Sequence, residues 1–234
     1  MEGAEMEPPK QSRRLVVEGG ESIVDFDNKA FKPIPQEGID LAVNAMNAGV
    51  MYRYQPKSKE ASITANFEHN FAKYMQVKHA VGTNSCGSAM FIALNIVGVQ
   101  PGDIVLTNAF TFHAVPSVIQ HARAIPVLVE SNREWAMDPE DLDKKAAQTG
   151  AKVLLMSYMR GHVPDMDAIM QIVEKHDLVL IEDCAHAYET LWNGKLLGTF
   201  GEIGCFSTQS SKGLSAGEGG IFITNNDEHA AKAV

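Results

Sequence analysis

From about residue 80 onward, the sequence alternates between segments of helical periodicity and short apolar runs with the length of buried strands. Strands are expected at 104–108, 125–130, 152–157, 178–183 and 220–224, and helices at 68–75, 88–97, 114–121, 139–147 and 165–176. This alternation predicts right-handed crossovers between parallel strands. We therefore expect an α/β fold whose mostly parallel central sheet carries helices on both faces.

The amino-acid composition is that of a soluble enzyme. With 234 residues, 45% of them hydrophobic, the chain is long enough for one large domain, which we expect over 15–234. The acidic, proline-bearing residues 1–14 predict a disordered tail and lack a secretion signal, so a cytoplasmic location is expected. A net charge of −9 argues against a nucleic-acid partner, and no apolar run reaches the ~18 residues of a membrane span.

The cysteines and histidines predict no metal site. Cys86, Cys184 and Cys205 each lie among apolar or small residues, as expected of reduced, buried thiols. The eight histidines show no spacing typical of zinc ligands.

Lys212 is the candidate nucleophile, since it lies among small residues in the loop that follows the apolar run 203–206. A lysine forms a Schiff base when part of its population is neutral, which burial or nearby cations favour. Asp183 ends an expected buried strand, where open α/β sheets place ligand groups. Together these residues suggest pyridoxal phosphate chemistry. Taken singly, Lys212 is more typical of an ordinary loop lysine, and Asp183 of a helix cap, than of a catalytic residue.

Asp183 and Lys212 belong to a series of short motifs that follow one another along the chain. They are residues 84–94 (NSCGSAMFIAL), 101–105 (PGDIV), 110–112 (FTF), 161–168 (GHVPDMDA), 179–187 (VLIEDCAHA), 204–212 (GCFSTQSSK) and 217–220 (GEGG). Over about residues 40–234 the chain resembles the DegT/DnrJ/EryC1/StrS family of sugar aminotransferases, which have the large domain of pyridoxal phosphate fold type I. Residues 158–160 depart from the His-Leu-Tyr that many relatives carry there.

The resemblance implies a role for each motif residue. Lys212 and Asp183 are the expected catalytic pair, with Lys212 bonded to the cofactor and Asp183 at its ring nitrogen. Phe112 is expected against the ring face, and His186 near the ring hydroxyl. Ser207 is expected at the phosphate.

The turn before the 88–97 helix is the other expected phosphate contact. Small residues there let backbone N–H groups approach an anion, or else form a capping turn without a ligand. Relatives usually have threonine at the position of Gly87, so the Gly87 and Ser88 amides and the Ser88 hydroxyl are expected to compensate.

The implied reaction is ping-pong transfer of an amino group from glutamate or glutamine to a keto-sugar, often nucleotide-linked, or a keto-cyclitol. The implied assembly is a homodimer, with the loop at Arg53 and Tyr54 near the subunit boundary or simply solvated. A helix begun at residues 226–228 without a later cap suggests a fragment that lacks the family's small C-terminal domain. A non-catalytic, cofactor-binding or regulatory remnant is therefore one alternative. A pyridoxal phosphate sugar dehydratase is another, which Lys212 disfavours because these relatives have histidine there.

Overall fold

The computed structural model describes residues 15–21, 34–49, 53 and 62–234. Residues 1–14, where a tail is expected, and Tyr54 of the expected boundary loop lie outside the described residues. The chain divides into residues 1–33 and a larger unit, Ile34–Val234. In the first unit, the described residues include a short 3₁₀ helix, η1 (Val16–Glu18).

The larger unit alternates helices and strands along the chain. Its elements are α1 (Gln36–Ala48), α2 (Ile63–Met75), β1 (His79–Thr83), α3 (Cys86–Ile96), β2 (Ile104–Asn108), α4 (Ala114–His121), β3 (Ile125–Val129), α5 (Pro139–Thr149), β4 (Val153–Ser157), η2 (Met159–Gly161), α6 (Met166–His176), β5 (Val179–Asp183), β6 (Leu191–Trp192), β7 (Lys195–Leu196), β8 (Ile203–Ser207), β9 (Gly220–Thr224) and α7 (Asp227–Ala233).

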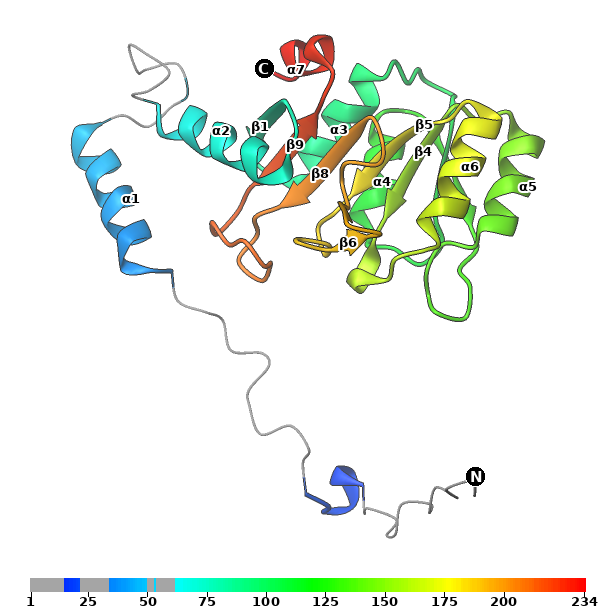
Figure 1. The fold of residues 1–234 in the computed structure, drawn as a ribbon, viewed down its shortest axis with the longest axis horizontal. Coiled ribbons are helices and arrows are strands. Elements are labelled where there is room, and N and C mark those ends of the chain that lie inside the picture. Colours follow the sequence, from blue (N-terminus) through cyan, green and yellow to red (C-terminus); the bar gives the residue numbers. More distant parts are fainter. Residues whose placement is uncertain (1–14, 22–33, 50–52, 54–61) are drawn as a thin grey trace, which may run out of the picture. The chain divides into compact units, whose positions relative to one another are not determined.

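Within residues 62–234 the structure has a seven-stranded sheet in the order β1-β9-β8-β5-β4-β2-β3 (Figure 1). The five strands from β8 to β3 are parallel, and β9 runs antiparallel to both of its neighbours, β1 and β8. The mostly parallel α/β sheet is thus confirmed. Strands β1 and β8 fall outside the expected set, because glycines interrupt their short apolar runs at Gly82 and Gly204.

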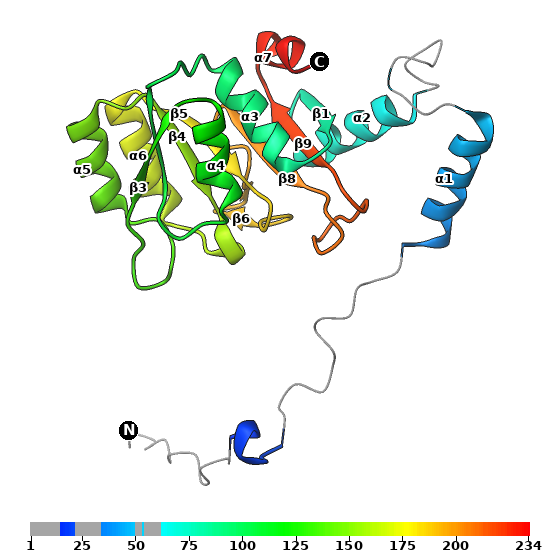
Figure 2. The ribbon, with the colours of Figure 1, turned by 180° about the vertical axis from the view of Figure 1, so that it is seen from behind.

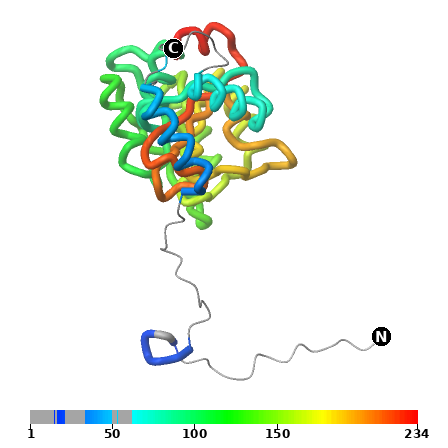
Figure 3. The backbone as a smooth tube through the Cα atoms, turned by 90° about the vertical axis from the view of Figure 1, so that its left-hand side faces the viewer, coloured from blue at the N-terminus to red at the C-terminus, as the bar shows by residue number. Residues whose placement is uncertain are grey.

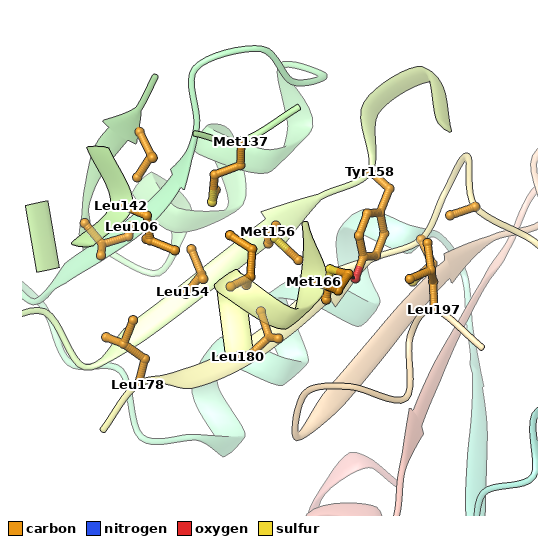
Figure 4. Close-up of a cluster of buried hydrophobic side chains, with 14 of the residues drawn as sticks. Leu106, Met137, Leu142, Leu154, Met156, Tyr158, Met166, Leu178, Leu180 and Leu197 are labelled. Atoms are coloured by element: carbon orange, nitrogen blue, oxygen red, sulfur yellow. The ribbon is translucent and has the colours of Figure 1, made fainter. Parts of the chain in front are cut away.

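Helices cover both faces of the sheet. One core cluster joins α2, α5 and α6 to one face, and a second joins α3 and α4 to the other (Figures 1 and 2). The strands alternate between the clusters: in β4, Leu154 and Met156 belong to the first, whereas Val153 and Leu155 belong to the second. Figure 4 shows the first cluster, where strand side chains meet Met166 of α6. Both faces of β4 are therefore buried, as its continuous apolar sequence predicts.

Local signals fix where most helices begin. Side-chain oxygens accept hydrogen bonds from backbone N–H groups of the first turn at Ser62, Ser85, Asp138, Asp165 and Asn226, before α2, α3, α5, α6 and α7. The expected helix start at 226–228 is confirmed by α7, which contacts β1, β9 and α3 and is the red segment in Figure 3.

Candidate active site

The carboxyl ends of β5 and β8 and the amino end of α3 surround a cavity of about 480 Å³. Six of the seven predicted site residues line it: Gly87, Phe112, Asp183, His186, Ser207 and Lys212. Ser88 instead lines a neighbouring cavity that shares Ser85 and Gly87 with the first. The volume lies in the 300–1,000 Å³ range of small-molecule sites, so the fold brings distant motifs into one ligand-sized space.

Asp183 is the last residue of β5 and only 4% exposed. Its Oδ2 accepts a hydrogen bond from Ser157 Oγ at 2.7 Å. Its Oδ1 accepts from the Ala185 amide at 3.1 Å and from Cys86 Sγ at 3.5 Å. A buried carboxylate with donors on both oxygens is held in one orientation, and Asp183 presents it at the cavity wall.

Lys212 lies across the cavity, with Nζ 2.8 Å from His186 Nε2. Burial lowers the pKa of the Lys212 amine, and nearby Arg160 lowers it further, while Asp183 and Cys86 oppose the shift. Burial also lowers the pKa of His186, as do Lys212 and Arg160, whereas Asp183 raises it. A neutral imidazole can accept a hydrogen bond from Lys212, and the depressed lysine pKa increases the neutral, nucleophilic amine.

The amino end of α3 forms the floor of the site. Ser85 Oγ accepts from the Ser88 amide at 3.0 Å and donates to Ser88 Oγ at 3.1 Å, so Ser88 takes part in capping the helix. The start of β9 passes so close that a Cβ on Gly220 would lie 2.3–2.5 Å from backbone atoms of Ser85 and Cys86. Gly220 therefore permits this backbone approach, which a side chain would block.

The other predicted residues lie at the rim and in the adjoining strand. Phe112 is 50% exposed, and its ring centroid is 4.2 Å from that of His113. Ser207 ends β8 and is buried. Among the described residues, the contact that its Oγ accepts is a long one, 3.4 Å, from the Gln209 amide. An exposed aromatic face and a weakly engaged hydroxyl are both suited to contact a ligand.

Several cavity residues were not predicted from the sequence. Gln209, Glu218 and Gly219 line the cavity, and Ser157 and Cys86 reach Asp183. For Ser157 a signal exists, since it ends an expected strand at the same edge of the sheet as Asp183. Gln209 lies in the 204–212 motif and Glu218 and Gly219 in the 217–220 motif, but the position of each along its motif does not show that it lines the cavity, because loop closure places it there.

Glu182, beside Asp183, points away from the cavity into the first core cluster. The Glu182 carboxylate accepts hydrogen bonds from Tyr158 Oη and from the backbone amides of Gly198, Phe200 and Gly201. Burial raises the pKa of Glu182, and these donors oppose that rise. The carboxylate thus holds the 198–201 loop against the strand that carries Asp183.

Arg53 is anchored rather than free. Its guanidinium donates to both oxygens of Glu68 at 2.9 and 2.6 Å and to Gly82 O at 3.0 Å.

Among the described residues no group of three or more His, Cys, Asp or Glu could hold a metal ion. Cys86, Cys184 and Cys205, all described, are free and buried. No helix in the described part of the chain is long and apolar enough to cross a bilayer.

Comparison with known proteins decides the family. The model of the DegT/DnrJ/EryC1/StrS aminotransferase family matches residues 53–234. The chain belongs to this family. Aminotransferases of the DegT family use pyridoxal phosphate.

Relatives of this DegT family member include biosynthetic proteins. The chain is 36% identical over 167 residues to the spore coat polysaccharide biosynthesis protein SpsC of Bacillus subtilis, covering 71% of this chain and 43% of SpsC. It is 30% identical over 217 residues to L-glutamine:2-deoxy-scyllo-inosose aminotransferase of Streptomyces kanamyceticus, covering 92% and 51%. The chain thus spans about half the length of the curated relatives it matches.

The fold also matches solved structures. The PLP form of Spr1654 from Streptococcus pneumoniae superimposes with a TM-score of 0.77 at 27% identity, covering 88% of this chain and 57% of Spr1654. The large-domain fold expected from the resemblance is therefore confirmed.

Proposed function

We propose that this chain binds pyridoxal phosphate in the 480 Å³ cavity and forms part of an aminotransferase acting on a keto-sugar or keto-cyclitol. The observation that carries the proposal is the shared cavity of Lys212 and Asp183, with the lysine amine held on His186. A primary amine of lowered pKa and a buried, oriented carboxylate are the two groups that this cofactor needs from a protein.

The side chains and backbone amides that line the cavity suit both ends of the cofactor. When bound, pyridoxal phosphate supplies an aldehyde and an electron-accepting ring. Lys212 would bond to the aldehyde carbon and move protons at the reacting carbon, while Asp183 would hold a proton on the ring nitrogen. Ser207 and the Gly87 amide would hold the phosphate at the amino end of α3, and the Ser88 amide would join them by leaving its capping contact with Ser85 Oγ. Phe112 would lie against the ring, and His186 would donate to the ring hydroxyl.

Relatives' names support the substrate class. SpsC is named for polysaccharide biosynthesis, and the Streptomyces kanamyceticus protein for transfer from L-glutamine to a cyclitol ketone. We therefore propose glutamine or glutamate as the amino donor, a nucleotide-linked keto-sugar or a keto-cyclitol as the acceptor, and ping-pong kinetics. We also propose a cytoplasmic location.

Covalent labelling tests the cofactor site. The chain is incubated with pyridoxal phosphate, reduced with borohydride and digested, and modified lysines are identified by mass spectrometry. We expect the label on Lys212, and its loss in Lys212→Ala with no transfer to other lysines. Lys152→Ala is the matched control, because Lys152 is exposed and pairs with Asp177 at the surface. Labelling spread over exposed lysines at equal rates would refute the proposal.

The half-reaction with glutamate or glutamine distinguishes an enzyme from a cofactor-binding remnant. We expect a change in cofactor absorbance with one of these donors, and a rate lower by orders of magnitude, at least ~100-fold, in Asp183→Asn, because the carboxylate no longer holds the ring proton. Labelling at Lys212 without any absorbance change would favour the remnant. Loss of water from the sugar, with the donor's amino group released as ammonia and none retained on the sugar product, would favour the dehydratase.

We also propose that the protein is a homodimer. Within the described residues, α1 has no buried residue, and its apolar Ile39, Val43 and Met46 recur at i, i+4 and i+7, which places them on one face. A second chain would cover such a face. Light scattering should give twice the chain mass, falling toward one chain mass in Val43→Glu. A strict monomer that binds pyridoxal phosphate tightly would contradict the dimer.

A further inference from the structure

Three buried polar side chains cross the sheet where neighbouring parallel strands end. Asn108 ends β2, Ser157 ends β4 and Asp183 ends β5, and they are only 2%, 3% and 4% exposed. Asn108 Oδ1 accepts a hydrogen bond from the Ser157 amide at 2.8 Å. Ser157 Oγ donates to Asp183 Oδ2 at 2.7 Å. We call this Asn108-Ser157-Asp183 series the strand-end relay.

The sheet itself does not require the relay. Residues 153–156 of β4 are all apolar and buried, so an apolar residue at position 157 would continue the strand without a buried hydroxyl. A buried hydroxyl is costly unless it is hydrogen-bonded. Ser157 and Asp183 are direct partners in the β4–β5 register, which places the hydroxyl beside the carboxylate. The hydroxyl therefore forms its hydrogen bond with Asp183, a carboxylate that lines the cavity at this edge of the sheet.

Ser157 is the strongest side-chain donor to this carboxylate among the described residues. Its 2.7 Å contact has the length of a charge-assisted hydrogen bond. Cys86 Sγ is 3.5 Å away, and a thiol is a weak donor. The Ala185 amide acts on the other oxygen, Oδ1. Rotation of the carboxylate about its last bond is therefore opposed mainly by Ser157, whose backbone is in turn tied to Asn108.

We propose that Ser157 is a positioning residue that acts through Asp183, fixing the plane of the carboxylate so that it meets the ring nitrogen of the cofactor. This inference rests on the proposed cofactor site. A hydroxyl that fixes one carboxylate oxygen determines where the remaining lone pairs point. Its loss leaves Asp183 held at Oδ1 alone, by the Ala185 amide and Cys86 Sγ, which loosens the orientation of the carboxylate and weakens the contact with the ring nitrogen without removing any group that touches the donor substrate.

A double-mutant cycle tests this role. Ser157→Ala, Ser157→Thr, Asp183→Asn and the Ser157→Ala/Asp183→Asn double variant are compared with the parent chain. Three quantities are measured. The dissociation constant of pyridoxal phosphate and the pH titration of its absorption band are measured with the cofactor alone. The single-turnover rate is measured with glutamate or glutamine.

We expect Ser157→Ala to slow the half-reaction about 10- to 100-fold. The donor concentration for half-maximal rate should stay within about twofold. The absorption midpoint should move in the same direction as in Asp183→Asn. Ser157→Thr, which keeps the hydroxyl, should restore both readouts to within about threefold of the parent. In the Asp183→Asn background, Ser157→Ala should change the rate by less than about twofold, because the two residues act as one unit.

Two results would overturn the inference. One is an equal rate loss from Ser157→Ala in both backgrounds. The other is an equal fall in thermal midpoint and cofactor affinity for the Ala and Thr variants, which would make Ser157 purely structural. If Lys212 of the parent is not labelled after borohydride reduction, the proposed cofactor site itself fails. If Lys212 is labelled and Asp183→Asn is slow while Ser157→Ala is silent, only the positioning role fails.

Discussion

Tyr158→Phe isolates the hydrogen bond that the buried Glu182 carboxylate receives from a side chain. The Tyr158 ring is fully buried beside Met166 and Leu197 (Figure 4). Phenylalanine keeps this ring and its packing, and removes only the hydroxyl that donates to Glu182. The carboxylate is then left with the backbone donors of the 198–201 loop.

The magnitude follows from the type of bond. A hydrogen bond to a charged group contributes about 1.5–3 kcal/mol to the free energy of unfolding. For a domain of this length, each kcal/mol shifts the thermal midpoint by about 2–4 °C. We therefore expect Tyr158→Phe to lower the midpoint by roughly 3–12 °C at pH 7, measured by circular dichroism together with urea unfolding.

The loss of stability in Tyr158→Phe should also depend on pH. Burial raises the pKa of Glu182 above its unfolded value of about 4.3. Between the unfolded and the folded pKa values, the folded chain therefore holds a proton that the unfolded chain has released, so this group's contribution to stability falls as pH rises from the first value through the second. The Tyr158 bond lowers that pKa, so its loss raises it further. The variant should lose more stability than the parent as pH increases from about 4.3.

Tyr74→Phe is the matched control. It removes the same hydroxyl from an exposed side chain, whose Oη donates to Glu189 at 2.8 Å. We expect a change within about 0.5 kcal/mol. Equal effects of the two substitutions, or a pH-independent deficit in Tyr158→Phe, would refute the reasoning about the buried carboxylate.

Three further predictions concern single contacts. Gly220→Ala should lower the urea midpoint by the equivalent of at least ~1 kcal/mol and weaken pyridoxal phosphate binding, because its Cβ meets backbone 2.3 Å away; an unchanged midpoint would contradict the close approach. Because burial lowers the pKa of Lys212, its trinitrophenylation by trinitrobenzenesulfonate should reach half its maximal rate at a lower pH than that of exposed Lys152, as measured by mass spectrometry; the reverse order would exclude the lowered pKa of Lys212. Arg53→Met should lower the free energy of unfolding by about 1 kcal/mol at low salt, because the ion pair with Glu68 is lost, and by less at high salt. Urea titrations at two salt concentrations measure this difference. A loss of stability that does not depend on salt would point to packing instead.

The sequence by itself determined many of the helices and strands, because their signals are local. Apolar period and length define β2 and β9, and the predicted bounds 104–108 and 220–224 match the structure. Side-chain caps such as Asn226 fix helix starts within three residues of sequence. The motif residues Lys212, Asp183 and His186 were also recognisable, because each belongs to a contiguous motif of the DegT family.

The tertiary structure alone decided how distant segments meet. The antiparallel insertion of β9 between β1 and β8 pairs residues far apart in sequence, and no periodicity encodes strand order. Ser157 reaches Asp183 across 26 positions, and Asn108 reaches Ser157 across 49. Such contacts exist only when the carboxyl ends of parallel strands align at one edge. The sequence therefore supplies the proposed site residues, and the register of the sheet holds and orients them.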